Sequence, residues 1–537
     1  MTQANQRQQR RLALAAEAEG FLTSFKLPTR LLQPETVVAH LGPTNSGKSY
    51  DALELLAAVG AGVYAAPLRL LAREGYEKLV ARLGPETVGL VTGQEVVNPT
   101  APIRCCTTEL APLRGEVLVL DEVHWLDDPD RGWAWGRLLA AAEYRHMRLV
   151  GAANTEPVLQ AAFGEALEIR RHRRLVPLHW AGPVTTAEVP PGSLIVAFSR
   201  KAVLALARDI SNATAMRVGV LYGALPPAAR RDQIEGFLDG TLNALCVTDV
   251  IGHGINLPAR SVVLAETSKF DGQRRRPLHL WELAQIVGRA GRFGLSEYGE
   301  ARVLRGVVGL EANATLARQA VEAAGGERSP GPSLLYGTIR PTLSDLGSST
   351  GAELVGAVDR WQFGAGAALG GHPWLRAASL APVSAALHRL AVEGLTSRLS
   401  VADLWHLATL PVEDPSWVPE VARAVVEPHR RLRVAPREDA ERWSLEEAER
   451  AASRARGLAS LAQAFPGVGG LEVEELLAVE AAAARRITAV LDHGIATAPF
   501  GRCQNCARTC PPYGELCDRC RGGTRPPLKK GYRGPRR

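Results

Sequence analysis

The octapeptide Gly42–Ser49 constrains the fold of this chain more than any other stretch of its sequence. It reads GPTNSGKS and matches the pattern G-x-x-x-x-G-K-[ST]. The apolar segment TVVAHL precedes it, and the helix-like segment YDALELLAAV follows it. Glycines let the loop curl so that backbone N–H groups face a phosphate chain, and the next helix adds its positive N-terminal end. The sequence therefore predicts a strand, a phosphate-binding loop and a helix, in that order.

The whole loop is a candidate nucleotide site. Its residues are Gly42, Pro43, Thr44, Asn45, Ser46, Gly47, Lys48 and Ser49. We expect Lys48 to reach the β- and γ-phosphates of ATP and Ser49 to bind Mg²⁺.

An acidic box ends the apolar run Val117–Leu120. It reads Asp121, Glu122, Val123, His124, which is a D-E-x-H pattern. A carboxylate at the C-terminal end of a buried parallel strand lies beside the phosphate loop in this class of fold. We expect Asp121 to hold Mg²⁺ and Glu122 to act as the general base toward the attacking water. His124 is expected to couple the nucleotide site to a second domain.

Short apolar segments alternate with helical stretches in two successive blocks. The first block contains TVVAHL, GVYAAP, TVGLVT, EVLVLD and MRLVGA, and the second contains GSLIVAF, RVGVLYG, NALCVTD, SVVLAET and ARVLRG. Fully apolar strands between helices indicate parallel sheets covered on both faces. The predicted fold class is therefore α/β, with two tandem RecA-like domains. The predicted parts are a basic arm (1–35), the two domains (36–180 and 181–305), a mostly helical region (306–500) and a small zinc module with a basic tail (501–537).

The second block carries two further motifs. Residues 285–292 have the spacing Q-x-x-G-R-x-G-R, and on a continuous helix Gln285, Arg289 and Arg292 would share one face. Two guanidinium groups there suit a transferring phosphoryl group, so all three residues are catalytic candidates. The glycine-rich stretch 248–258 makes Asp249 and Gly254 nucleotide-binding candidates.

Five of the eight cysteines crowd into residues 503–520. Cys503 and Cys506 form one C-x-x-C pair and Cys517 and Cys520 another, which is typical of a Cys₄ structural zinc site. Cys510 is a fifth candidate. An iron–sulfur cluster and unligated cysteines are the alternatives.

The net charge of +7 and the pI of about 9.1 suit a polyanionic partner, although they also suit simple solubility. No apolar run is long enough to span a bilayer, which argues against a membrane partner. The N-terminus lacks a secretory pattern, so a cytoplasmic location is expected.

Together the motifs resemble superfamily 2 helicases. The strings PLRLLA, GLVTGQE, RGWAW and ELAQIVGRAGRFG resemble the RNA helicase of the mitochondrial RNA degradosome and its bacterial relatives, over about residues 36–295. The resemblance implies an ATP-dependent motor that translocates 3′ to 5′ and unwinds RNA or RNA–DNA duplexes. It makes RNA-degradation proteins candidate partners. It also implies strand contacts at residues in the matching motifs, namely Pro67, Arg69, Thr107, Thr108, Ser199, Arg200 and Thr248. The string at 151–157, GAANTEP, departs from the family pattern, so the coupling motif there is expected to differ.

Three alternatives remain at the level of sequence. One is a DNA helicase or repair motor, because fold and motor motifs do not select the nucleic acid. Another is a nucleic-acid-stimulated ATPase that separates no strands. The third is a zinc-organised interaction protein with a vestigial ATPase, against which the intact motifs argue.

Overall fold

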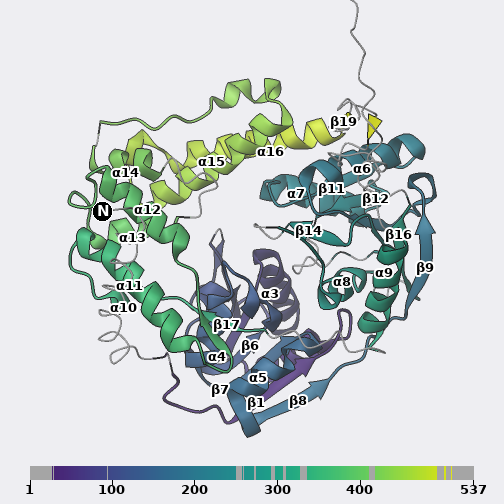
Figure 1. Cartoon of the computed structure of the whole chain (residues 1–537), viewed down its shortest axis with the longest axis horizontal. Helices are drawn as coiled ribbons and strands as arrows, with labels where there is room; N and C mark the ends of the chain where they lie inside the picture. Colours follow the sequence, from purple (N-terminus) through teal and green to yellow (C-terminus); the bar gives the residue numbers. More distant parts are fainter. Residues whose placement is uncertain are drawn as a thin grey trace, which may run out of the picture.

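Two parallel β-sheets and a helical region make up the described part of the chain (Figure 1). This computed structural model describes residues 27, 29–93, 95–248, 257, 259–270, 274–291, 297–305, 310–326, 335–410, 418–427, 429–492, 501–502 and 509–510. Among these residues, no helix combines the length and apolar character needed to cross a membrane.

The first sheet has eight strands in the order β4-β3-β5-β2-β6-β7-β1-β8. Only the β3–β4 pair is antiparallel. The strands are β1 (Thr36–Leu41), β2 (Gly62–Ala66), β3 (Val88–Val91), β4 (Val96–Val97), β5 (Ile103–Thr107), β6 (Arg114–Leu120), β7 (Glu143–Gly151) and β8 (Leu167–Arg171). Helices α2 (Lys48–Val59), α3 (Arg69–Leu83), α4 (Trp133–Ala141) and α5 (Glu156–Phe163) connect and cover them. Strand β2 and the second half of β6 are buried and apolar, as expected for a sheet with helices on both faces. The neighbouring strands β5 and β7 also carry Arg104, Arg145 and Arg148.

The second sheet has six parallel strands in the order β11-β12-β10-β13-β16-β9. They are β9 (Leu178–Val184), β10 (Ser193–Val196), β11 (Val218–Leu221), β12 (Ala244–Val247), β13 (Ser261–Leu264) and β16 (Gly299–Leu304). Helices α6 (Arg200–Ala213), α7 (Pro227–Leu238), α8 (Leu280–Val287) and α9 (Leu310–Gly325) accompany them. Each apolar segment of both predicted blocks coincides with a strand, so the two parallel-sheet domains are present.

The boundaries of the second domain differ from those predicted. Strand β9 begins at Leu178 and pairs with β16, so the end of the range 36–180 belongs to the second sheet. Helix α9 was assigned to the range 306–500, but Ala317 and Ala320 are buried in the core of the second sheet. The sequence placed both segments by their position along the chain, whereas packing against β16 decides where they belong.

The remaining helices form one region that contacts both sheets. They are α10 (Leu343–Leu346), α11 (Gly351–Leu369), α12 (Ala381–Val392), α13 (Val401–Ala408), α14 (Val418–Val426), α15 (Leu445–Ala464) and α16 (Val473–Asp492). Two short strands, β17 (Gly337–Ile339) and β18 (Leu375–Ala377), pair in parallel at its start. The prediction of a mostly helical region is confirmed.

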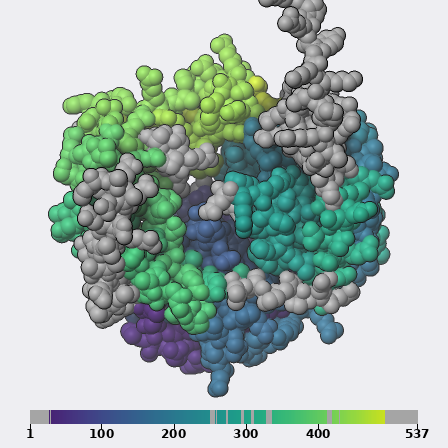
Figure 2. Space-filling view, in the orientation of Figure 1, coloured from purple at the N-terminus to yellow at the C-terminus, as the bar shows by residue number. Residues whose placement is uncertain are grey.

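The helical region closes a circuit around a central hollow (Figures 1 and 2). At one end β17 lies against α4 so closely that a Cβ at Gly136 would overlap the carbonyl oxygen of Thr338. At the other end Glu449 of α15 accepts hydrogen bonds from Arg200, at 3.0 Å, and from the hydroxyl of Tyr222. Both sheets are therefore tied to the same helical region.

Candidate functional site

The phosphate loop lies between β1 and α2, as the sequence predicted. Asn45 and Gly47 have φ angles of 60° and 76°, the left-handed conformation that turns the loop inward. Lys48 is buried, and its Nζ donates a hydrogen bond to the carbonyl oxygen of Pro43 at 3.0 Å. The ammonium group thus lies inside the curl of the loop, where a phosphate chain would bind.

Asp121 stands at the carboxyl end of β6 and faces the phosphate loop. Its Oδ1 accepts from the Ser49 hydroxyl at 3.3 Å, and its Oδ2 accepts from the Tyr64 hydroxyl at 2.7 Å. Burial and the negative charge of Glu122 raise the pKa of Asp121 to about 6, against the opposing effects of Tyr64 and Lys48. Ser49 and Asp121 therefore present a hydroxyl and a carboxylate to one point, which is a donor set that fits Mg²⁺.

Glu122 and His124 lie between this carboxylate and the second domain. Glu122 has a φ of 49°, which is strained for a residue other than glycine. Its Oε2 lies 3.4 Å from Nδ1 of His124. The His124 ring meets Trp281 of α8 edge-on, with centroids 6.3 Å apart. His124 therefore contacts Glu122 of the first domain and Trp281 of the second, which is the position expected of a residue that couples the two domains.

The prediction that one continuous helix carries Gln285 and Arg289 is wrong. Helix α8 ends at Val287, and Arg289 lies in the turn that follows. Gly288 is packed against the Thr44 side chain so tightly that a Cβ would overlap it, and Gly291 has a φ of 72°. Local spacing favoured a longer helix, but this contact with the phosphate loop ends it. Arg292 lies outside the described residues.

Arg289 and Gln285 consequently face different spaces. Arg289 is half-buried and lines a cleft of about 1290 Å³ together with Asp121, Glu122 and the phosphate loop from Thr44 to Ser49. Burial lowers the pKa of Arg289, while the nearby charges of Glu122, Glu74 and Asp121 act in the opposite direction. Gln285 instead lines a smaller pocket of about 180 Å³ with His124 and Trp281. The cleft thus gathers a cation from one domain and carboxylates from the other.

The candidate strand-binding residues of the first domain lie at the carboxyl ends of β2 and β5. Pro67 precedes α3, Arg69 is the first residue of that helix, and Thr107 and Thr108 are buried where β5 ends. Arg131, from the string DPDRGWAW, donates to the Pro67 carbonyl at 2.5 Å and to Glu109 at 2.6 Å. The sequence did not single out Arg131, which links the segment at Pro67 to the segment at Glu109.

The second-domain candidates have structural partners of their own. Ser199 caps α6 by accepting a hydrogen bond from the Ala202 N–H at 3.1 Å. Arg200 pairs with Glu449 and lies over the Tyr222 ring, 5.8 Å from its centroid. Thr248 is buried just after β12. Ser199 therefore stabilises the start of α6, and Arg200 links α6 to α15. Contacts with a nucleic-acid strand would be additional to these roles.

Three arginines from three parts of the chain lie near one another. They are Arg69 of α3, Arg230 of α7 and Arg456 of α15. The pKa of Arg69 is lowered first by burial and then by the charge of Arg456, and the pKa of Arg230 is lowered by burial, Arg456 and Arg69. Arg456 also forms an ion pair with Glu480 at 2.9 Å. The charges of Glu109 and Glu480 act on the pKa of Arg69 in the opposite direction to burial. No sequence signal links these residues, because they meet only when α15 closes the circuit.

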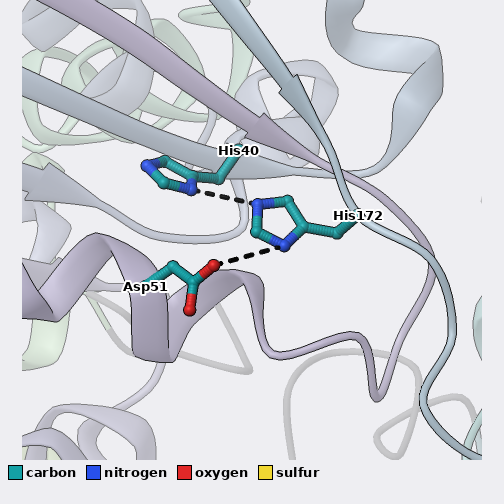
Figure 3. A group of neighbouring side chains, drawn as sticks. All are labelled: His40, Asp51 and His172. Carbon is teal, nitrogen blue, oxygen red and sulfur yellow. Dashed lines mark hydrogen bonds and ion pairs between the residues drawn. The ribbon is translucent and has the colours of Figure 1, made fainter.

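His40, Asp51 and His172 form a connected group beside the phosphate loop (Figure 3). Nδ1 of His40 lies 3.0 Å from Nε2 of His172, and Nδ1 of His172 lies 3.7 Å from Asp51. The three ligand atoms are within 4.8 Å of one another, which is close enough for a metal ion. However, His172 turns one ring nitrogen toward each neighbour, so the group is a chain and not a shell around one point. We read it as a set of contacts that joins β1, α2 and the end of β8.

Several predicted site residues lie outside the described residues. These are Asp249, Gly254, Arg292, Cys503, Cys506, Cys517 and Cys520. Near the cysteines, the structure describes only the antiparallel pair β19 (Gly501–Arg502) and β20 (Thr509–Cys510).

Each of the two sheet domains matches a helicase family model. Residues 27–172 match the family model described as the DEXQ-box helicase domain of Suv3, and residues 184–294 match the helicase conserved C-terminal domain. A mitochondrial ATP-dependent RNA helicase SUV3 of Saccharomyces paradoxus is 36% identical over 278 residues, 48% of this chain and 36% of that protein. The SUV3L helicase of Oryza sativa is 38% identical over 269 residues, again 48% and 36%. The chain thus spans about a third of the length of these relatives.

A solved structure is also similar. It is S. cerevisiae Dbp5 bound to RNA and ADP BeF3, with 18% identity, a TM-score of 0.42, and coverage of 57% of this chain and 90% of that one.

The expected cytoplasmic location is wrong by this comparison. The SUV3 relatives of Saccharomyces paradoxus, Candida albicans and Oryza sativa are all named as mitochondrial proteins. The expectation rested on the lack of a secretory pattern, which separates secreted proteins from others but does not distinguish compartments inside the cell.

The His40 chain makes a prediction for stability. Burial, followed by the charges of His172, Arg170 and Arg148, lowers the pKa of His40 from 6.5 to about 4. Between these values the unfolded chain binds a proton that the folded chain does not, so stability falls as the pH drops through this window. We expect wild-type protein to lose about 2 kcal/mol more than His40→Gln between pH 7 and pH 5. Urea unfolding at both pH values measures this, and equal losses would contradict it.

Proposed function

Because the chain carries the two domains of a superfamily 2 helicase, the first of the Suv3 type, we propose that it is an ATP-dependent RNA helicase. The observation that carries the proposal is the shared cleft. Lys48, Ser49 and Asp121 face Arg289 across it, so a nucleotide would contact both domains at once. The RNA helicase relatives favour RNA as the substrate.

In the proposed reaction, residues of this chain bind the phosphates of ATP and orient and activate the attacking water. Lys48 and the loop N–H groups bind the phosphates, and Ser49 and Asp121 hold Mg²⁺, which neutralises charge on the phosphate oxygens. Glu122 orients the attacking water and accepts its proton. Arg289 stabilises charge on the transferred phosphoryl group from the opposite domain. Since Arg289 comes from the second domain, domain closure completes the catalytic set and opening releases the product.

The proposed strand path runs over both domains and the helical region. Arg69, Arg230 and Arg456 bring three cations together where α3, α7 and α15 border the central hollow (Figure 1). Glu480 pairs with Arg456, and Glu109 lies near Arg69, so two carboxylates balance part of this charge. A phosphate backbone would supply further negative charge to the three guanidinium groups. We propose that the strand moves 3′ to 5′ along this path and that the two sheet domains, with β9 and α9 counted in the second, act as the two motor halves.

Substitution of Lys48 tests the motor. Lys48→Ala should reduce ATP turnover to background while leaving RNA binding measurable, because the lysine contacts phosphate and not the strand. Strand displacement on 3′-tailed RNA, DNA and RNA–DNA duplexes, with ATP turnover measured alongside, gives the readout. Lys201→Ala, an exposed lysine on α6, is the matched control. Full turnover in Lys48→Ala would refute the assignment, turnover without displacement would favour an ATPase that separates no strands, and preference for DNA would favour a DNA motor.

Substitution of Arg456 tests the strand path. Arg456→Gln should weaken single-stranded RNA binding and reduce the slope of log K against log salt by about one phosphate contact. Arg145→Gln removes the same charge from the start of β7, where Arg145 pairs with Glu35, and should leave binding unchanged. Fluorescence anisotropy across a salt series measures both. An unchanged slope in Arg456→Gln would remove α15 from the path.

We also propose a structural zinc site made by Cys503, Cys506, Cys517 and Cys520. The β19–β20 pair supports it, because Arg502 and Thr509 are register partners on either side of the first C-x-x-C pair. Elemental analysis should find about one zinc per chain. Cys506→Ser should lose the metal and Cys510→Ser should keep it. Iron with visible absorbance would favour a cluster, and no metal at all would overturn the site. Partner proteins in RNA degradation, which the sequence resemblance implied, remain part of the proposal.

A further inference from the structure

Arg174 lies in the segment that joins the two sheets, between the end of β8 and the start of β9. Its Nη1 donates to the carbonyl oxygens of Thr44 at 3.2 Å and Gly288 at 2.7 Å. Its Nη2 donates to the carbonyl oxygens of Gly291, at 3.2 Å, and Ala290. Its Nε donates to the carbonyl oxygen of Val176 at 2.7 Å. One side chain thus contacts the phosphate loop, the turn after α8 and its own linker.

All of these partners are main-chain carbonyl groups. Burial lowers the pKa of Arg174 to about 10, so the group stays charged at neutral pH. Its recorded hydrogen bonds, all within the described part of the chain, include no carboxylate. A half-buried cation surrounded by carbonyl dipoles still costs desolvation energy, and only good geometry offsets that cost. This arrangement therefore serves the position of those carbonyls more than the stability of the fold.

The carbonyls that Arg174 holds frame Arg289. Gly288 and Ala290 are the two chain neighbours of Arg289, and Thr44 belongs to the loop on the other side of the cleft. The same contact is reinforced where Asn45 donates to the carbonyl oxygen of Gly291. Arg174 itself is not among the residues that line the cleft, whereas its neighbours Arg173 and Leu175 are. It acts on the nucleotide site through main-chain position and not through direct contact.

We propose that Arg174 is a positioning residue that sets Arg289 in register with the phosphate loop, so that hydrolysis depends on the interdomain linker. This rests on the proposed function, in which Arg289 stabilises the transferred phosphoryl group. Arginine suits the role because its planar fork of N–H donors can reach several carbonyls at once. A lysine would keep the charge but could not span the same acceptors. When the domains part, Arg174 must give up either the Thr44 or the Gly288–Gly291 carbonyls.

Steady-state ATP hydrolysis in the presence of RNA tests the proposal on the full chain. Arg174→Gln should lower kcat by about 100-fold, the cost of misplacing a catalytic group by about an ångström, with KM for ATP changed less than about threefold. Arg174→Lys should resemble Arg174→Gln, since the fork and not the charge is required. Arg170→Gln, on β8 and paired with Glu168 at the surface, is the control and should match wild type.

A double variant separates positioning from a general structural effect. If Arg174 acts through Arg289, then Arg174→Gln combined with Arg289→Gln should be no slower than Arg289→Gln alone. Multiplied losses, a raised KM with kcat preserved, or wild-type kcat in both Arg174 variants would each overturn the inference. If Arg174→Gln does not fold, as judged by its unfolding midpoint, Arg174→Lys carries the same comparison. Wild-type protein without ATP turnover would instead overturn the proposed function.

Discussion

The close approach of the phosphate loop to the turn after α8 is the contact on which the rest of the site depends. Gly288 rests against Thr44, and Asn45 donates to the Gly291 carbonyl. This contact ends α8 at Val287, turns Arg289 into the cleft and leaves Gln285 beside His124. Because the loop side chains Thr44 and Asn45 contact the main chain on either side of Arg289, small errors in the angle between the domains would displace Arg289 directly. A motor that must sense closure benefits from such a contact, since it forms only when both domains are in place.

The helical region packs against both domains that form the nucleotide cleft. Trp135 of α4 donates its indole N–H to the Asp121 carbonyl at 3.0 Å, and the next residue, Gly136, receives the backbone of β17. At the far end, Glu449 joins α15 to Arg200 and Tyr222 of the second domain. The string RGWAW and the glycine after it therefore lie where the first domain meets the helical region. Trp135 contacts the acidic box, and Gly136 contacts β17. Movement of either domain is transmitted to the same helices, which also bring Arg456 to the proposed strand path.

The sequence predicted the strands well because fully buried parallel strands are apolar whatever surrounds them. It predicted the phosphate loop and the acidic box because their residues are contiguous and local geometry suffices. It failed at Gln285–Arg289, where helical spacing continued but a contact with Thr44, far away in the chain, ended the helix. It also missed Arg131 and Arg174, whose partners are main-chain carbonyls on distant segments or an acid 22 residues away. Carbonyl groups carry no sequence signature, so nothing in the chain marked these arginines.

The arginines also show why composition alone was uninformative. The chain has 63 basic residues, of which seven are lysines, a bias that coding or solubility could explain equally well. In the structure, the guanidinium groups of three arginines have different surroundings. Arg174 meets only carbonyls, Arg289 faces the carboxylates of the cleft, and Arg456 shares its surroundings with Arg69 and Arg230. In the proposed roles, the first needs a planar fork, the second a permanent charge that faces carboxylates, and the third a cation for phosphate. Lysine could supply only the last of these, so the preference for arginine is a geometric requirement at some positions and incidental at others.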